Sequence, residues 1–301
     1  MASRKLVGSF FTLNEDYHAL QRADLLSAAK RSGFGVEVLD AEENAVLQIH
    51  QLFQRIHAPL DERPLAFLVH TRVPDGLERV ARNAAAAGIG WILLNRSAPY
   101  VEALRREYPR VTISAVAADN HEIGRIQARQ FRAILPSGGS VLYVQGPPGT
   151  AAAQARLEGM NEGIVDTGII IKVLPAEWTE ASGEMAVAAW LRLKTSELFK
   201  PDLVGCQNDA LALGARRALQ AHRPEWARVP FTGCDGLPER GRRLVTTKEL
   251  AATIEVAPCT GPAVDLIDQA LKTDRPAPER VLVPPQSLPP IEGIDKASTR
   301  P

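Results

Sequence analysis

Short apolar runs alternate along the chain with longer stretches in which apolar residues recur every three or four positions. The short runs predict strands, and the longer stretches predict helices that bury one face. In the stretch 45–57, for example, Val46, Ile49, Phe53 and Ile56 share one helical face. The predicted strands are 5–11, 35–40, 65–70, 90–94, 111–115, 140–145, 169–174, 203–206, 229–233 and 251–255. The predicted helices include 19–31, 45–57, 77–87, 121–135, 152–165 and 184–199.

Strictly alternating strands and helices build a parallel sheet with helices on both faces, so the predicted fold class is α/β. About ten strands are many for one open sheet. Two doubly wound lobes of five or six strands each are therefore the simpler prediction, with the first ending near 116–120. The tail 276–301 is rich in proline. Apart from the apolar run 281–283, we expect it to be loop or edge strand.

Composition narrows the possible functions. The chain has 301 residues, of which 45% are hydrophobic, so it can bury a large core. Its 35 basic and 35 acidic residues cancel, which excludes a broad basic surface for nucleic acid or anionic lipid. Three cysteines are too few for a disulfide framework. No apolar stretch is long enough to span a bilayer, and the start of the chain lacks the pattern of a secretory signal. We expect a periplasmic protein if a leader has been removed, and a cytoplasmic one otherwise.

Motifs for catalysis are weak throughout. The sequence Gly146-Pro147-Pro148-Gly149-Thr150 resembles the start of a phosphate-binding loop, but alanines follow where a lysine is required. A tight strand-to-helix turn is the better interpretation. His50 and His57 lie on one predicted helix without further metal-ligand candidates beside them. No nucleophile elbow occurs. We predict a protein that is not an enzyme and that needs no cofactor and no metal.

Polar and aromatic residues gather after the predicted strands, where open α/β sheets bind ligands. They are Phe10, Phe11, Asn14, Tyr17, Asn95, Arg96, Arg156, Trp178, Gln207, Asn208, Asp209, Asp235 and Glu255. Planar donors and acceptors can each serve two neighbouring hydroxyl groups, and aromatic faces cover the apolar face of a sugar ring. The set therefore predicts a polyhydroxylated ligand.

Each of these residues also has a purely structural interpretation. Asn208 or Asp209 could cap a helix over 210–221, and Asp235 could cap one that begins near Pro238. Arg96 could pair with a surface carboxylate, and Trp178 could belong to the core. The prediction of a binding site rests on the collective pattern.

The order of several short motifs resembles the type I periplasmic binding proteins of the ribose-binding class, whose fold is shared with effector domains of the lactose-repressor family. The motifs are Val38-Leu39-Asp40-Ala41 with Gln48 and Gln51, Ala87-Gly88-Ile89, Leu93-Leu94-Asn95-Arg96, Ala118-Asp119-Asn120 with Gly124, Arg156-Leu157-Glu158-Gly159, Gln207-Asn208-Asp209-Ala210, Gly233-Cys234-Asp235-Gly236 and Ala252-Thr253-Ile254-Glu255. The likeness runs over nearly the whole chain.

The resemblance implies two lobes joined by a three-strand hinge, with a ligand cleft between them. The first would comprise 1–117 plus 256–282, and the second 118–255 plus 283–301. Arg96, Arg156, Asn208 and Asp235 match polar ligand contacts of the family, and Phe10, Phe11 and Trp178 match its aromatic contacts. The family often has Asp where this chain has Asn95, and Gln where it has Glu255. These departures point to a ligand other than ribose: a hexose, a polyol or a compound carrying an amine.

The resulting hypothesis is a solute-binding protein that captures a small sugar or polyol by hinge closure and delivers it to the membrane subunits of an ABC importer or to a membrane sensor. The alternative is the ligand-sensing effector domain of a lactose-repressor-like transcription regulator, or a cytosolic sugar sensor. The first predicted strand begins at residue 5, which leaves no room for a DNA-reading segment in this chain, so we expect no contact with nucleic acid. An enzyme using Asp235 and Glu255 as acid and base is a third, weaker alternative.

Overall fold

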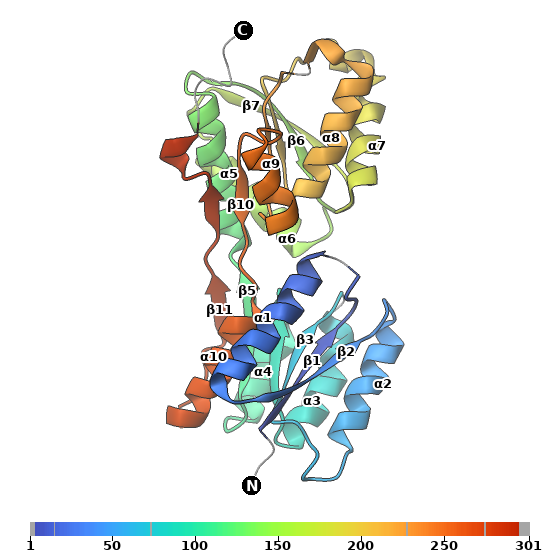
Figure 1. The fold of residues 1–301 in the computed structure, drawn as a ribbon, viewed down its shortest axis with the longest axis vertical. Coiled ribbons are helices and arrows are strands. Elements are labelled where there is room, and N and C mark those ends of the chain that lie inside the picture. The colour runs from blue at the N-terminus through green and yellow to red at the C-terminus, as the bar shows by residue number, and fades with distance from the viewer. Residues whose placement is uncertain (1–3, 15, 73, 227, 274, 295–301) are drawn as a thin grey trace. The chain divides into compact units, whose positions relative to one another are not determined.

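The computed structural model describes residues 4–294 except 15, 73, 227 and 274. The chain forms two compact α/β units, and it passes between them three times. Unit 1 consists of Met1–Ala118 and Ala257–Val283, and unit 2 of Asp119–Val256 and Pro284–Pro301. Each unit has its own parallel sheet with helices on both faces, which confirms the predicted fold class (Figure 1).

Unit 1 is built on a six-stranded sheet in which every neighbouring pair is parallel. The strand order is β11(Arg280–Val283), β5(Ile113–Ala118), β4(Gly90–Leu94), β3(Ala66–His70), β1(Lys5–Phe10) and β2(Gly35–Asp40). The helices of this unit are α1(Asp16–Ser32), α2(Ala45–Ile56), α3(Glu78–Ala86), α4(Pro99–Glu107) and α10(Thr260–Thr273). The apolar run of the tail supplies the edge strand β11, which pairs with β5.

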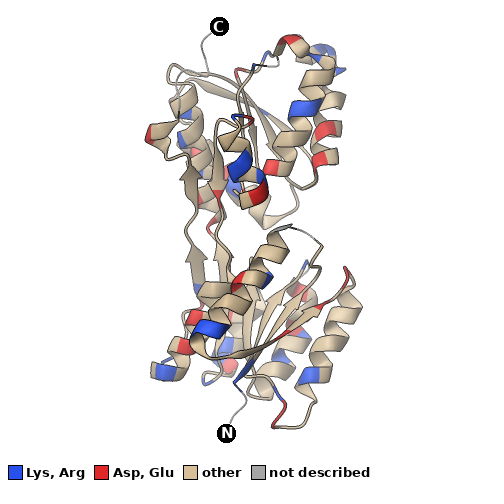
Figure 2. Ribbon diagram, viewed as in Figure 1, with Lys and Arg blue, Asp and Glu red and all other residues tan. Residues whose placement is uncertain are grey.

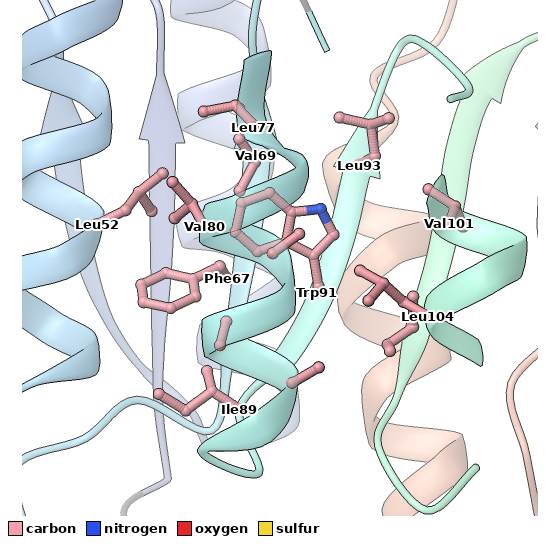
Figure 3. Close-up of a cluster of buried hydrophobic side chains, with 14 of the residues drawn as sticks. Leu52, Phe67, Val69, Leu77, Val80, Ile89, Trp91, Leu93, Val101 and Leu104 are labelled. Carbon is pink, nitrogen blue, oxygen red and sulfur yellow. The ribbon is translucent and has the colours of Figure 1, made fainter. Parts of the chain in front are cut away.

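The core of unit 1 lies on both faces of this sheet. On one face, side chains of α2, α3 and α4 pack on the strands, and Trp91 lies fully buried among them (Figure 3). Its ring meets the edge of Phe67 with 6.1 Å between the ring centroids. On the other face, α1 and α10 contribute residues such as Leu25 and Val264. The strands are therefore buried on both sides, which explains their continuous apolar runs.

Unit 2 has a four-stranded parallel sheet in the order β7(Ile169–Pro175), β6(Gly139–Gln145), β8(Leu203–Cys206) and β9(Phe231–Thr232). A separate antiparallel pair joins β10(Thr253–Glu255) to β12(Gln286–Leu288). The helices are α5(Asn120–Ile134), α6(Ala151–Gly163), α7(Glu180–Leu191), α8(Asp209–His222) and the short α9(Arg243–Thr246). One face of the sheet packs against α7 and α8, and the other against α5 and α6.

Polar caps place the helix starts directly after the strands. The Asn44 side chain accepts hydrogen bonds from the N–H groups of Val46 and Leu47, both 3.0 Å long. Asp119, Thr150, Thr179 and Asn208 cap α5, α6, α7 and α8 in the same manner. Because these caps satisfy N–H groups that have no partner inside the helix, they fix where each strand-end loop stops.

The predicted elements differ from the observed ones mainly at their ends. The predicted strand 229–233 shrinks to the two residues of β9, and the predicted helix 184–199 begins earlier, after the Thr179 cap. That helix stops at Leu191, and a separate 3-10 turn covers Lys194–Ser196. Helix α4 was not predicted, although Pro99 in its first turn is a typical start signal.

Acidic and basic side chains are interspersed on the helices of each unit (Figure 2). Several form ion pairs between neighbouring helices. Arg217 of α8, for example, lies 2.7 Å from Glu180 and 3.2 Å from Glu184, both of α7. Exposed pairs of this kind contribute little to stability, so they mainly keep the surface soluble.

Helices α5 and α6 approach closely because glycines face each other across the contact. A Cβ atom on Gly124 would overlap the carbonyl oxygen of Arg156 and lie 2.7 Å from the backbone nitrogen of Met160. A Cβ atom on Gly159 would overlap the carbonyl oxygen of His121. This contact sets the position of the α6 backbone around Arg156.

We predict that Gly124→Ala lowers the free energy of unfolding by about 3 kcal/mol, because backbone atoms cannot yield to the added methyl group as a side chain could. Urea unfolding followed by circular dichroism measures this. The control is Gly149→Ala, where a Cβ atom would meet no atom within 4 Å. Equal stabilities of the two variants would contradict the proposed role of the contact.

Candidate ligand-binding site

The predicted site residues lie at the carboxyl ends of the parallel strands in both units. In such sheets these ends carry the polar loops, since the strands themselves are buried. Each unit is described separately below, beginning with the loops that follow β1, β3 and β4 in unit 1.

Asn95 follows β4 in the left-handed backbone conformation, with φ of 61°. Its Oδ1 atom accepts hydrogen bonds from the Tyr17 hydroxyl at 3.4 Å and from Nε2 of Gln21 at 3.3 Å. Gln21 in turn accepts hydrogen bonds from the backbone N–H groups of Cys259 and Thr260 at 3.0 and 3.2 Å. The loop after β4 is thus tied to α1 and to the start of α10.

Arg96 lies beside this loop and is partly buried. Its Nε atom donates to the carbonyl oxygen of Thr71, at 3.0 Å, after β3. Within the part of the chain that the structure describes, no carboxylate lies at ion-pair distance from Arg96, so the structural alternative of a surface ion pair is not seen there. Burial lowers the pKa of Arg96, and the positive charge of Arg72 lowers it further. Arg72, which the sequence analysis missed, lies with its guanidinium carbon 5.7 Å from the ring centre of Phe11.

Two buried histidines form a pair at the same strand ends. The Nε2 atoms of His18 and His70 are 3.1 Å apart, so one ring donates and the other accepts. Burial and the positive neighbours His18 and Arg96 hold the pKa of His70 well below its usual value. His70 is therefore neutral near pH 7. Sequence analysis missed this pair, although the position of His70 at the end of a buried strand could have indicated it.

The remaining predicted residues of unit 1 differ in exposure. Phe10 is fully buried in the core, 6.5 Å from the ring of His70. Phe11 lies where β1 ends and keeps 9% of its surface exposed. Asn14 is exposed, and its backbone N–H donates to the Thr12 hydroxyl at 3.2 Å. Of the two phenylalanines, only Phe11 keeps any exposed surface, so the structure gives no support for Phe10 as a ligand contact.

In unit 2, Arg156 is nearly buried, with 8% of its surface exposed. It projects from α6, where Nε donates to the Asn120 side chain at 2.9 Å and Nη1 donates to the carbonyl oxygen of Gln207. The guanidinium lies 5.4 Å from the ring centre of Trp178. These contacts hold a charged planar group at the strand ends in one orientation.

Asn208 is the N-cap of α8, which is one of the structural interpretations that the sequence offered for it. Its Oδ1 accepts from the N–H of Leu211 at 2.8 Å, and its Nδ2 donates to the carbonyl oxygen of Trp178 at 3.0 Å. Trp178 is partly buried against the core. A Cβ atom on Gly146 would overlap the Trp178 ring. The loop 146–150 between β6 and α6, called the glycine loop below, therefore packs directly against Trp178. Asn208 therefore has a structural role whether or not it touches a ligand.

Asp235 and Glu255 lie on adjacent, parallel backbone segments that form a β-bridge. Asp235 has φ of 105°, a conformation that an L residue rarely adopts. It does not cap the turn at Pro238–Arg242, which starts after Leu237 without a side-chain cap. Glu255 lies 2.7 Å from Arg242, so its charge has a partner of its own.

Asp209 is almost fully buried beneath these loops. Its two carboxyl oxygens accept hydrogen bonds from the Thr253 hydroxyl at 2.6 Å and from the N–H of Gly236 at 2.9 Å. Burial, together with the negative charge of Asp235, raises the pKa of Asp209 to about 8. The carboxyl group links α8 to β10 and to the loop after β9.

Gln207 organises the other strand ends of unit 2. Its Oε1 accepts from the N–H of Gly146 at 3.0 Å. Its Nε2 donates to the Tyr143 hydroxyl at 3.0 Å and to the carbonyl oxygen of Ala153 at 2.9 Å. Gln207 thus fixes both the glycine loop and the first turn of α6, from which Arg156 projects.

Comparison with known proteins identifies the family. A family model described as periplasmic binding protein domain matches residues 9–255. The chain belongs to this family. The resemblance seen in the sequence is thereby confirmed.

Two relatives within this family illustrate how far the likeness extends. The ribose import binding protein RbsB of Escherichia coli K12 is 27% identical over 269 residues, which cover 88% of this chain and 83% of that protein. A putative rhizopine-binding protein of Rhizobium meliloti is 25% identical, over 78% of this chain and 74% of its own length.

Solved structures share the fold of this periplasmic binding protein. A Caulobacter myo-inositol binding protein matches with a TM-score of 0.75 and 23% identity, covering 95% of this chain and 94% of its own. A solute-binding protein of Actinobacillus succinogenes with bound D-allose matches with a TM-score of 0.79 and 20% identity, covering 98% of both chains.

Within residues 4–294, gaps aside, no helix combines the length and apolar character that crossing a membrane requires. In that same part of the chain, no three His, Cys, Asp or Glu side chains come together as a metal site would require.

We predict that Asp209 makes the protein less stable as pH rises from about 4 to about 8. The folded state holds the Asp209 proton over this range, whereas the unfolded chain releases it near pH 4, so raising the pH favours unfolding. Asp209→Asn mimics the protonated form and should not lose this stability. Urea unfolding between pH 5 and pH 8 measures this. The free energy of unfolding of the wild type should fall as pH rises, relative to that of Asp209→Asn. The exposed Asp61→Asn variant should follow wild type, and a constant difference between wild type and Asp209→Asn would contradict the prediction.

Proposed function

We propose that the protein binds a small sugar or polyol and delivers it to the membrane subunits of an ABC importer or to a membrane sensor. Membership of the periplasmic binding protein family supports this proposal. So do its relatives, which include a ribose import binding protein. Similar structures hold myo-inositol and D-allose. These matches favour transport over the effector domain of a regulator.

The observation that carries the proposal is the set of oriented polar groups at the strand ends. Arg156 is held by two hydrogen bonds and lies over Trp178, which combines a cationic donor with an aromatic face. Asp235 and Arg96 add an acceptor and a donor at other strand ends. We propose that these residues, together with Phe11, Asn14, Tyr17, Asn95, Asn208 and Glu255, contact the ligand. Charge-assisted hydrogen bonds to hydroxyl groups would supply most of the specificity.

The role does not call for a catalytic step. A binding protein needs to hold its ligand reversibly, and no cofactor is part of the proposal. The family name and the import function of the relatives support a periplasmic location.

We predict that Arg156→Ala weakens binding of the best sugar or polyol ligand by about 30-fold or more, equivalent to about 2 kcal/mol. A ligand hydroxyl would lose its charged partner in a buried setting. Isothermal titration calorimetry with a panel of pentoses, hexoses and inositols measures the effect. Arg217→Ala is the matched control, because that arginine lies on the outer face of α8.

Two results would count against the proposal. If no sugar or polyol of the panel binds or raises the melting temperature at saturating concentration, the function is wrong. If a ligand binds equally well to Arg156→Ala, and urea unfolding shows that this variant is folded, then Arg156 does not belong to the site.

A further inference from the structure

The hydrogen bonds around Asn95 determine which end of its side chain remains for a ligand. Backbone N–H groups can only donate, so the contacts from Cys259 and Thr260 identify the Gln21 oxygen as their acceptor. The Gln21 nitrogen must therefore be the group that faces Asn95, and it must donate. The Asn95 atom that it meets is then the oxygen, at 3.3 Å.

The Asn95 oxygen also accepts from the Tyr17 hydroxyl. Both of its lone pairs are thus used inside the unit. Among the described residues the amide nitrogen makes no hydrogen bond, and Asn95 is partly exposed, so this nitrogen is the group left for a ligand. Where the family often has an aspartate, which can only accept when ionised, this chain offers a donor.

Two arginines belong to the same loops: Arg96 follows Asn95 in the chain, and Arg72 follows Thr71, whose carbonyl oxygen accepts from Arg96. Arg96 uses Nε for the carbonyl of Thr71, and Arg72 lies over Phe11. Their charges are close enough that Arg72 depresses the pKa of Arg96. Among the side chains that the structure describes, no carboxylate forms an ion pair with either arginine. Arg96 is partly buried and Arg72 is exposed, so a bound anion would offset both charges and most of all that of Arg96.

The neighbouring histidine pair strengthens this picture. The Nε2–Nε2 contact of His18 and His70 at 3.1 Å requires one neutral acceptor ring, so the pair cannot supply a negative charge. Arg96 acts on His70 as a positive neighbour. The carboxyl ends of β3 and β4 therefore present positive charges and hydrogen-bond donors to a ligand.

We propose that the ligand carries an oxyanion group, a carboxylate or a phosphate on a sugar or polyol frame, and that Arg72, Arg96 and the Asn95 amide bind this group. The inference rests on the proposed function, and it narrows the ligand from neutral sugars to their acidic derivatives. Guanidinium groups suit carboxylate and phosphate oxygens because their N–H donors match two oxygens at once.

Matched pairs of compounds test the proposal by isothermal titration calorimetry on the full chain. Galactose is compared with galacturonate, glucose with glucuronate and with glucose 6-phosphate, and glucitol with gluconate. At least one acid should bind about tenfold or more tightly than its neutral partner, and added salt should weaken that binding. The sugar acids and the sugar phosphate separate a carboxylate from a phosphate as the preferred group.

Two variants locate the effect. Asn95→Asp keeps the oxygen that accepts from Gln21 and Tyr17 but replaces the outward donor with a negative oxygen. It should weaken acid binding about tenfold or more, and Arg72→Gln should weaken it by a similar factor. Asn83→Asp and Arg79→Gln on helix α3 change the net charge equally and should leave binding unchanged.

The outcomes separate this proposal from the function on which it rests. If neutral sugars bind and none of the acids binds more tightly, the inference is overturned while the binding function stands. If acids bind equally well to wild type and to Asn95→Asp, the assignment of this end of unit 1 is overturned. If nothing in the panel binds, both proposals fail together.

Discussion

Buried glutamine side chains hold the strand ends from which several of the candidate ligand contacts project. Where a parallel strand stops, its last N–H and C=O groups lose their sheet partners, and burying them without replacement is costly. In unit 1, Gln48 donates to the Ser9 hydroxyl at 3.1 Å and to the carbonyl of His70 at 2.9 Å. In unit 2, the Gln207 side chain forms hydrogen bonds with the N–H of Gly146, the hydroxyl of Tyr143 and the carbonyl oxygen of Ala153 in α6. A glutamine suits this task because its amide both donates and accepts at the end of a long side chain.

These bonds also mean that the polar side chains at the strand ends are oriented before any ligand arrives. Arg156 is held by Asn120 and by the backbone of Gln207, so binding would cost little side-chain entropy. Asn208 caps its helix and cannot turn away without exposing the α8 N-terminus. Stability and recognition therefore share the same groups, and their separate contributions to affinity and folding can be distinguished only by measuring both for each variant.

The alternation of apolar runs and amphipathic stretches was sufficient to predict the fold class, because a strand buried on both faces and a helix buried on one face leave different local patterns. It left out α4 and predicted wider bounds for β9 than the structure has, because both elements are short and draw their stability from tertiary packing. The candidate residues that could be found from the sequence are those that follow a strand closely, as Asn95 follows β4. Sequence analysis missed Arg72 and the histidine pair, whose significance comes from neighbours distant in sequence. The orientation of the Asn95 amide also could not be predicted from the sequence, because it is set by a hydrogen bond between Gln21 and Cys259, which are 238 positions apart.

The hydrogen bond between Gln21 and Cys259 also explains how the residue at position 95 can decide whether the site favours a neutral or an acidic ligand. A left-handed residue is tolerated when it is Asn or Asp, so either can occupy position 95 without added backbone strain. Either also provides the oxygen that Gln21 and Tyr17 need, so the scaffold does not distinguish between them. The two residues differ in the atom that faces outward, a donor in one case and a negative acceptor in the other. A hydrogen-bond donor attracts an oxyanion, whereas a carboxylate repels it. The preference for acidic or neutral ligands can therefore change at this position while the surrounding structure stays the same.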